Sequence, residues 1–222
     1  MTGNPVRGRW FPFSGGLQQR IRNAIVPLDE VAGAVPAQGR ILEIGCGEGL
    51  ILKRLVDRSV SLVGVDIDER KVAMARSAFA GDPHVRLQVQ DAFEFLAGTA
   101  DGCYSAALLA DTLSSFAPER QVPLLREMFR VVAPGGLLIV KAIDGKVRWK
   151  TAMSRLLSGL VYRVLRLSVS DGQRFTYMAS GELKAALEAM GGEVTVRHLH
   201  RERFHPIPHI LVVAAKGPGA GP

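Results

Sequence analysis

A short apolar run followed by closely spaced glycines constrains the fold of this chain more than any other segment. The run Ile41–Ile44 has the length and apolar character of a buried strand, interrupted by one acid, Glu43. Three glycines follow it at alternate positions: Gly45, Gly47 and Gly49. Glycines at the turn from a strand into a helix allow positive φ angles and let a ligand approach the main chain closely. We therefore expect a ligand-binding loop here, followed by a helix over Leu50–Asp57.

The spacing of these glycines and the acid before them limit the kind of ligand. A dinucleotide-binding loop has the pattern Gly-x-Gly-x-x-Gly, and a triphosphate-binding loop ends on Lys followed by Ser or Thr. Here the third glycine comes one position early, and Leu50 follows it. Glu43 would also repel a pyrophosphate, whereas it suits a ligand that carries a positively charged amine. The segment therefore favours S-adenosylmethionine over a dinucleotide.

Strand and helix patterns alternate along the chain after this loop. Apolar segments typical of buried strands lie at Arg40–Ile44, Ser61–Asp66, His84–Gln90, Tyr104–Ala110 and Leu137–Ala142. Helical patterns lie between them, including Glu69–Ala80 with Asp68 as its N-cap and a helix that ends near Val132. This alternation predicts an α/β fold with a parallel sheet and helices on both faces.

Three of the predicted strands end on, or directly before, an acid: Asp66, Asp91 and Asp111. Ligands of open parallel sheets bind beyond the carboxyl ends of the strands. At these positions Asp66 can accept hydrogen bonds from two ribose hydroxyls, and Ile67 can pack on an adenine face. Asp91 can accept a hydrogen bond from the adenine amine, with Ala92 and Phe93 supplying backbone contacts and an apolar wall. Helix capping or loop solvation is the alternative for each acid alone, and the glycine loop at this spacing favours the ligand.

These segments together resemble the class I S-adenosylmethionine-dependent methyltransferases, over about residues 40–216. The motifs that carry the resemblance are Glu43–Gly49, Val65–Asp68, Gln90–Phe93 and the helix and turn Phe129–Gly136. The resemblance implies a Rossmann-like sheet of seven strands, mostly parallel, with the last strand antiparallel. Glu193–Arg203 and Ile207–Ala215 fit the sixth and seventh strands.

The resemblance also implies the cofactor, S-adenosylmethionine, and the residues that hold it. The glycine loop would bind the methionine moiety, Asp66 the ribose and Asp91 the adenine, while Glu43 would orient the loop and the amino group. The full set of expected cofactor-binding residues is Glu43, Gly45, Cys46, Gly47, Gly49, Asp66, Ile67, Asp91, Ala92, Phe93 and Ala110.

The residue that would act on the methyl acceptor is less well defined. A base is needed only if the acceptor must lose a proton. Asp111 lies nearest to the expected methyl group, and Asp144 and Lys141 at the end of the fifth strand are further candidates. The histidines are His84, His198, His200, His205 and His209. For each of them a surface or structural role is favoured, so Asp111 and Asp144 are the expected catalytic residues.

Composition sets outer bounds on the function. At 222 residues and 47% hydrophobic content, the chain can bury the core of one domain. Cys46 and Cys103 offer neither a disulfide framework nor metal-ligand spacing, so no metal is expected. The chain shows no secretory signal and no apolar stretch of the roughly 20 residues that span a membrane, which predicts a cytoplasmic location. The net charge of +7 would suit nucleic acid or an anionic membrane, but many soluble enzymes are basic.

Two segments outside the predicted sheet are expected to define the acceptor. Residues 1–39 form a predicted N-terminal helical cap ahead of a methyltransferase domain at 40–216, and residues 217–222 form a flexible tail. Within the domain, an insertion at about 146–177 carries apolar residues at helical spacing, with basic residues mostly off that stripe. A helix packed on the edge of the sheet and a lid over an apolar acceptor carry about equal weight. A basic amphipathic face that contacts a membrane is a further interpretation.

Motifs that the sequence lacks argue against several classes of methyl acceptor. After the fourth strand the chain has Asp111-Thr112-Leu113-Ser114, not the Asn/Asp-Pro-Pro-aromatic run of enzymes that methylate adenine or cytosine amines. The Pro-Cys pair of cytosine carbon methylation and the double-acid loop of arginine methyltransferases are also missing. We therefore expect a small, partly apolar acceptor of secondary metabolism, such as a phenolic, polyketide or lipid-linked compound. An RNA methyltransferase and a non-catalytic S-adenosylmethionine-binding protein are the alternatives. Nucleic acid is disfavoured as a partner, peripheral membrane contact is allowed, and the oligomeric state is left open.

Overall fold

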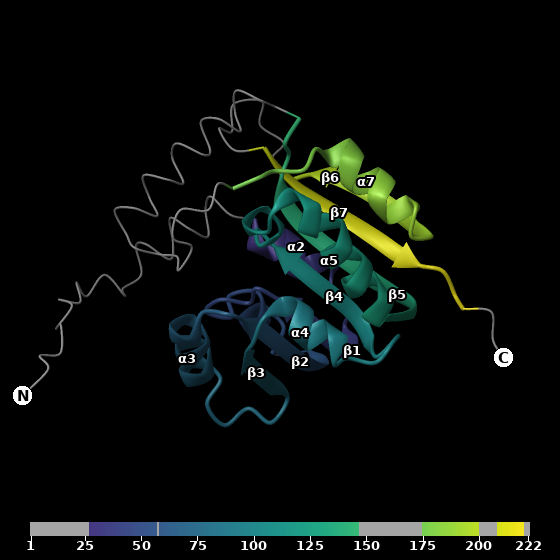
Figure 1. The fold of residues 1–222 in the computed structure, drawn as a ribbon. Coiled ribbons are helices and arrows are strands. Elements are labelled where there is room, and N and C mark those ends of the chain that lie inside the picture. The colour runs from purple at the N-terminus through teal and green to yellow at the C-terminus, as the bar shows by residue number, and fades with distance from the viewer. Residues whose placement is uncertain (1–26, 57, 147–174, 200–207, 220–222) are drawn as a thin grey trace, which may run out of the picture.

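The computed structural model describes residues 27–56, 58–146, 175–199 and 208–219, and these form one seven-stranded sheet with helices on both faces (Figure 1). The strands are β1 (Gln38–Ile44), β2 (Ser59–Asp66), β3 (Val85–Val89), β4 (Tyr104–Ala110), β5 (Val132–Ile143), β6 (Gly192–His198) and β7 (His209–Lys216). Their order across the sheet is β3-β2-β1-β4-β5-β7-β6. Strands β1 to β5 pair in parallel, and β7 is antiparallel to both of its neighbours. The predicted fold class, with its antiparallel last strand, is confirmed.

Two hydrophobic clusters lie on opposite faces of the sheet. The helical elements are α2 (Leu28–Ala34), η1 (Leu52–Arg54), α3 (Glu69–Ala78), α4 (Ala92–Ala97), η2 (Leu113–Ser115), α5 (Pro118–Val131) and α7 (Ser180–Glu188). One cluster joins the sheet to α4, α5 and α7, and the other joins it to α2 and η1. Successive strand residues serve opposite clusters, as Ile41 and Leu42 do, because side chains alternate along a strand.

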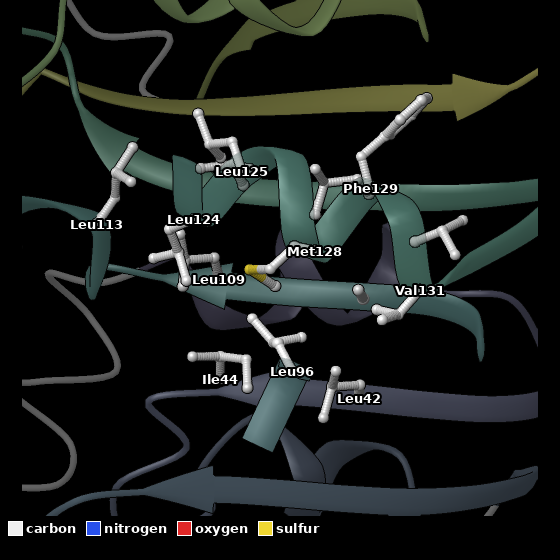
Figure 2. Packing of buried hydrophobic residues seen from close by; sticks show 14 of the residues in the cluster. Leu42, Ile44, Leu96, Leu109, Leu113, Leu124, Leu125, Met128, Phe129 and Val131 are labelled. Atoms are coloured by element: carbon white, nitrogen blue, oxygen red, sulfur yellow. The ribbon is translucent and has the colours of Figure 1, made fainter. Parts of the chain in front are cut away.

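Helix α5 shows how the first cluster is built (Figure 2). Pro118 occupies the first helical position, where a missing N–H is not needed by the helix. The buried side chains of the helix include Leu124, Leu125 and Met128, which recur at helical spacing. They meet Leu42, Ile44 and Leu109 from the strands and Leu96 from α4, all of which are buried. This packing fixes the end of β4. The loop that follows begins with Asp111, the residue expected to act on the methyl acceptor.

The helix predicted for Leu50–Asp57 is wrong. The structure has only a short 3₁₀ element there, with hydrogen bonds from Arg54 N–H to Ile51 O and from Leu55 N–H to Leu52 O. Ile51, Leu52 and Leu55 are all buried in the second cluster. The tighter turn already places these three apolar side chains against the sheet, so their packing does not require a full α-helix.

Helix α2 lies within the segment predicted as an N-terminal cap, but it packs on the sheet. Its residues Leu28, Val31 and Ala32 are buried in the second cluster, and β1 already begins at Gln38. The other residues of the predicted cap, 1–26, lie outside the described residues. Among the helices of the described ranges, none is long and apolar enough to cross a membrane.

Candidate cofactor and acceptor site

The three loop glycines all have positive φ angles, but the structure needs them for different reasons. The φ angles are +73° at Gly45, +52° at Gly47 and +72° at Gly49. A Cβ on Gly45 would lie 2.2 Å from Oγ1 of Thr112, and one on Gly49 would lie 2.6 Å from the ring of Phe79. At Gly47 the nearest heavy atom would be 3.9 Å away. The loop is therefore closed by packing at its two ends and open at Gly47, where a ligand can reach the main chain.

Asp66 lies beside this open position. Its Oδ2 accepts a hydrogen bond of 2.8 Å from Gly47 N–H, and its Oδ1 accepts one of 2.9 Å from Asp68 N–H. The side chain of Asp68 in turn caps α3, as predicted from the sequence. The next residue, Ile67, is 69% exposed, which is unusual for a large apolar side chain in this fold. The predicted ribose-binding acid, an exposed apolar side chain and the glycine loop thus lie together at the ends of β1 and β2.

Glu43 is a buried acid at the end of β1. Its exposed fraction is 3%, and its Oε2 has no hydrogen-bond partner among the described residues. Burial, and next the negative charge of Asp66, raise the pKa of Glu43 from 4.5 to about 8. A buried carboxylate oxygen without a partner is costly unless a ligand satisfies it. Its position directly before the loop fits a cationic amine such as that of the methionine moiety.

Cys46, between the first two glycines, packs inside the protein. Its side chain is buried, and a Cβ on Gly64 of β2 would lie 2.9 Å from its sulfur. Burial, then the charges of Glu43 and Asp66, raise the pKa of the Cys46 thiol strongly. The thiol therefore stays neutral and is no nucleophile. Its contribution to the site is the backbone of the loop, where Cys46 N–H donates to Val65 O.

Asp91 caps helix α4, a helix that was not predicted. Its Oδ1 accepts hydrogen bonds from Phe93 N–H at 2.8 Å and Glu94 N–H at 3.3 Å. The capping alternative considered for this acid is thus present, while the described residues give Oδ2 no hydrogen bond. Ala92 is buried, and the ring of Phe93 lies 4.4 Å from the guanidinium carbon of Arg120. Capping and recognition of an adenine amine are compatible because they use different oxygens.

Asp111 forms an ion pair with Lys141 at the ends of β4 and β5. The Lys141 ammonium contacts Oδ2 of Asp111, and Asp111 N–H donates to Lys141 O at 2.9 Å. The hydroxyl of the next residue, Thr112, donates to Ala110 O at 3.0 Å and approaches Gly45 O at 3.4 Å. Thr112 was not predicted as a site residue, and only the adjacency of β1 and β4 brings it to the loop. Asp111 is therefore the sequence neighbour of a residue, Thr112, that contacts the predicted cofactor loop.

The contacts of Asp144 favour a structural role over the expected catalytic one. The residue is buried, and its Oδ1 accepts hydrogen bonds from Lys146 N–H at 3.0 Å and Ser180 N–H at 2.9 Å. Its Oδ2 accepts a third from the hydroxyl of Ser180, also at 2.9 Å. The carboxylate therefore holds the first residue of α7, and both of its oxygens are engaged.

The described histidines lie at three different places in the sheet, and His209 pairs with Ile143, the residue before Asp144. His84 precedes β3 and is exposed, His198 ends β6 and is exposed, and His209 is buried at the start of β7. His200 and His205 lie outside the described residues. The preference for surface or structural roles stays a prediction for all five histidines.

Both ends of the predicted insertion are held at the carboxyl edge of the sheet. Gly145 N–H donates to Met178 O at 3.1 Å, and Thr176 N–H donates to Ser114 O at 3.1 Å. Gln121 also donates from its side chain to Thr176 O at 2.9 Å. Residues 147–174, with most of the predicted apolar stripe, lie outside the described residues. The chain nevertheless leaves and re-enters the described structure close to the loop that begins at Asp111.

Comparison with known proteins identifies this arrangement. Residues 41–136 match the family model of a methyltransferase domain. The chain is 40% identical over 89 residues to a ribosomal RNA small subunit methyltransferase A of Geobacter sulfurreducens. This match covers 39% of the present chain and 30% of that protein. It is 28% identical over 166 residues to a ubiquinone biosynthesis O-methyltransferase of Azorhizobium caulinodans, covering 72% and 61%.

A solved structure shows the same fold over most of the chain. The 1,6-didemethyltoxoflavin-N1-methyltransferase of Burkholderia thailandensis, bound to S-adenosylhomocysteine, superimposes with a TM-score of 0.64 at 13% identity. The match covers 90% of this chain and 82% of that one. The sheet order and the family match together define a Rossmann-like methyltransferase fold. Residues 41–136 form a class I S-adenosylmethionine-dependent methyltransferase domain, and the cofactor of that class is S-adenosylmethionine.

The curated relatives extend beyond the matched region. The chain spans from about a third to three-fifths of the length of the curated relatives named above. Residues 41–136, which match the family model, include the cofactor loop and the three strand-end acids. The acceptor of this chain must therefore be inferred from its own residues.

Proposed function

We propose that this protein transfers a methyl group from S-adenosylmethionine to a small, partly apolar acceptor, such as a phenolic, polyketide or lipid-linked compound. The observation that carries the proposal is the buried Oε2 of Glu43, which has no hydrogen-bond partner among the described residues. Its carboxylate interacts electrostatically with Asp66, which accepts a hydrogen bond from Gly47 N–H at the open position of the loop. Such a buried acid suits the amino group of the cofactor and would be costly without a ligand. Asp66, hydrogen-bonded to Gly47, adds the acceptor that ribose hydroxyls need.

The other expected cofactor-binding residues offer an apolar side chain and a carboxylate oxygen that suit the adenosine part of the cofactor. Ile67 offers an exposed apolar side chain, and Asp91 keeps Oδ2 available beside Ala92 and Phe93. Ala110 ends β4 directly before Asp111, where the acceptor would approach. The cofactor supplies a methyl group already activated by a sulfonium. The protein's task is then to orient an acceptor, and positioning of this kind accounts for about 7–11 kcal/mol of a reaction barrier.

Two observations support a small, partly apolar acceptor. The ubiquinone and toxoflavin relatives are named for small-molecule methylation. The segment between Lys146 and Phe175 starts and ends beside the loop of Asp111, and its sequence is rich in apolar residues with interspersed arginines. Such a sequence suits an apolar acceptor, and its basic residues suit contact with an anionic membrane when the acceptor is lipid-linked.

Cofactor calorimetry followed by a labelled-methyl assay tests this function. The protein should bind S-adenosylhomocysteine and transfer label to the solvent-extractable phenols and lipids of a bacterial lysate. Cofactor binding without transfer to any fraction would instead identify a non-catalytic binding protein. Loss of cofactor binding altogether would contradict the whole proposal.

RNA methylation is the second candidate, favoured by the ribosomal RNA methyltransferase relative and by the net charge of +7. Phosphate contacts release counterions, so RNA binding should weaken steeply as salt rises. Label that appears in RNA and disappears between low and moderate salt would establish this alternative. Transfer to solvent-extractable compounds that is insensitive to salt would exclude it.

Asp66→Ala should weaken cofactor binding by about 1–3 kcal/mol, because a partly buried ligand would lose hydrogen bonds. Asp82→Ala is a matched control, since Asp82 Oδ1 accepts a hydrogen bond of 2.8 Å from His84 N–H, two residues on, as Asp66 does from Asp68. The control should leave the dissociation constant for S-adenosylhomocysteine unchanged in calorimetry. Equal affinity of Asp66→Ala and the parent would show that the ribose assignment is wrong.

Leu156→Ala and Leu160→Ala should lower acceptor turnover by about tenfold or more each, because an apolar pocket that loses methylene contacts loses 1–3 kcal/mol. Their affinity for S-adenosylhomocysteine should change less than about threefold, because a substitution far from the cofactor site has little effect on the free energy of cofactor binding. Leu187→Ala, in the buried face of α7, is the control and should lower the melting temperature instead. If both insertion variants melt early and keep their turnover, the segment belongs to the structural core.

A further inference from the structure

Lys141 is a buried lysine in the middle of the sheet, with no exposed surface. It lies near the end of β5, on the same face as Ile139, which packs in the second cluster. A lysine is almost never fully buried unless it is paired. Burial lowers the pKa of Lys141, against the opposing effect of the Asp111 carboxylate. The chain therefore maintains a cation in a place that an apolar residue would fill at lower cost.

The partner of Lys141 is held in an unusual backbone conformation. Asp111 has a φ of +56° and is the one residue other than glycine with a positive φ in the described ranges. Its N–H is tied to Lys141 O, and its Oδ2 contacts the Lys141 ammonium. The side chain is 42% exposed, and the described residues give Oδ1 no hydrogen bond. One oxygen thus faces the buried lysine while the other remains accessible.

Asp111 is also tied to the cofactor loop through its neighbour. The side chain of Thr112 fills the space that a Cβ on Gly45 would need, and its Oγ1 lies 3.4 Å from Gly45 O. The accessible carboxylate oxygen therefore belongs to the loop next to the methionine end of the predicted cofactor site. Backbone strain of this kind gathers at functional sites.

We propose that the acceptor carries a hydroxyl group, that Asp111 takes its proton, and that Lys141 is the positioning residue that holds the Asp111 carboxylate toward it. This inference rests on the proposed methyl transfer and names its acceptor class. The acceptor oxygen forms a bond to the methyl carbon as the bond from that carbon to sulfur breaks. The electron pair of the broken bond stays on sulfur, which becomes a neutral thioether, and the hydroxyl proton passes to Asp111.

The charge of the pair favours a hydroxyl over an amine. Asp111 and Lys141 together are neutral, so they offer little net attraction to a protonated amine. A neutral hydroxyl needs one hydrogen-bond acceptor, which Oδ1 of Asp111 provides. A phenol or enol fits this requirement, because a nearby base can take its proton during the transfer.

The experiment compares Lys141→Met and Asp111→Asn with the parent on two probes, catechol and 4-nitrocatechol. The nitro compound is ionised at mildly alkaline pH and has little need of a base. With catechol, kcat should fall by about 100-fold in both variants, in the range that a general base contributes. With 4-nitrocatechol the fall should be less than about tenfold.

Two readouts do not depend on turnover. Both variants should bind S-adenosylhomocysteine as the parent does. Asp111→Asn should lower the melting temperature by about 5 °C or more, because it leaves Lys141 buried without a counter-ion, whereas Lys141→Met should lower it far less. Lys184→Met removes a surface pair with Glu188 on α7 and should change none of these quantities.

The outcomes distinguish failure of the hydroxyl-acceptor proposal from failure of the proposed function. A parent-like kcat of Lys141→Met on catechol would overturn the positioning role. An equal loss on both probes would also overturn it, because that pattern marks a structural defect. Absence of transfer to either phenol, with S-adenosylhomocysteine bound normally, would overturn the hydroxyl assignment. Failure to bind S-adenosylhomocysteine would instead refute the proposed function itself.

Discussion

Gly47→Val should abolish cofactor binding, with a loss of at least about 100-fold in affinity, or about 3 kcal/mol. A Cβ at this position would meet no protein atom closer than 3.9 Å, so the new side chain would project into the space left for the ligand. Val at a φ of +52° is also strained, which by itself costs about 1–3 kcal/mol of folding stability. Calorimetry with S-adenosylhomocysteine measures the first effect, and urea unfolding measures the second.

Gly135→Val is the matched control for this experiment. Gly135 has a φ of +75° and no atom within 4 Å of a new Cβ, and it lies in the first part of β5, away from the loop. It should lose similar stability and keep full cofactor affinity. Equal affinity of the two variants would show that the open side of Gly47 does not face the cofactor.

Glu43→Gln should remove most of the dependence of stability on pH between about pH 4.5 and pH 8. In the fold the pKa of Glu43 is raised from 4.5 to about 8, so the folded protein retains a proton that the unfolded chain has lost in this window. This contribution to the free energy of unfolding is fully present below pH 4.5 and is lost as the pH rises through 8. The slope is about 1.4 kcal/mol per pH unit, which amounts to a few kcal/mol over the window.

Urea unfolding at a series of pH values measures this effect directly. The parent should lose stability steadily from pH 5 to pH 8, whereas Glu43→Gln should stay nearly level and be the more stable protein at pH 8. Glu127→Gln, on the surface of α5, is the control and should follow the parent. A Glu43→Gln profile as steep as that of the parent would mean that another group titrates.

The same carboxyl links pH to cofactor binding. If the cofactor amine lies beside Glu43, binding favours the ionised carboxylate and releases a proton near neutral pH. Calorimetry in two buffers of different ionisation enthalpy should detect this proton for the parent and not for Glu43→Gln. The absence of proton release from the parent would place the amine elsewhere.

The central strands could be predicted because β1, β4 and β5 each contain a run of buried apolar residues. The bounds of β4 coincide with the prediction, and β1 and β2 differ only by added residues at their starts. The helices were harder to predict, because their formation depends more on contacts between residues that are distant in the sequence. Helix α7 was not foreseen because its first residue, Ser180, is held by Asp144, 36 positions earlier. Segment 50–57 was predicted as a helix because its apolar spacing could not reveal that a 3₁₀ turn suffices.

The cofactor loop could be predicted in more detail than the acceptor residues. Gly47 and Asp66 belong to consecutive strand ends, and the structure joins them by a direct hydrogen bond. Asp111 and Lys141 were each candidates for the acceptor, but their pairing depends on the parallel register of β4 and β5. The sequence holds no local sign of such a register, since the two residues are 30 positions apart.

The junction at Gly145 has a consequence for how the acceptor preference of this fold can change. A Cβ on Gly145 would lie 2.3 Å from Tyr177 O, and Gly145 N–H donates to Met178 O, so the two ends of segment 147–174 leave the sheet at one point. The entropy of closing a loop between fixed ends grows only slowly with its length, by about 0.6 kcal/mol for each doubling. Segments of very different length and sequence could therefore be exchanged at this junction without disturbing the strands or the cofactor loop.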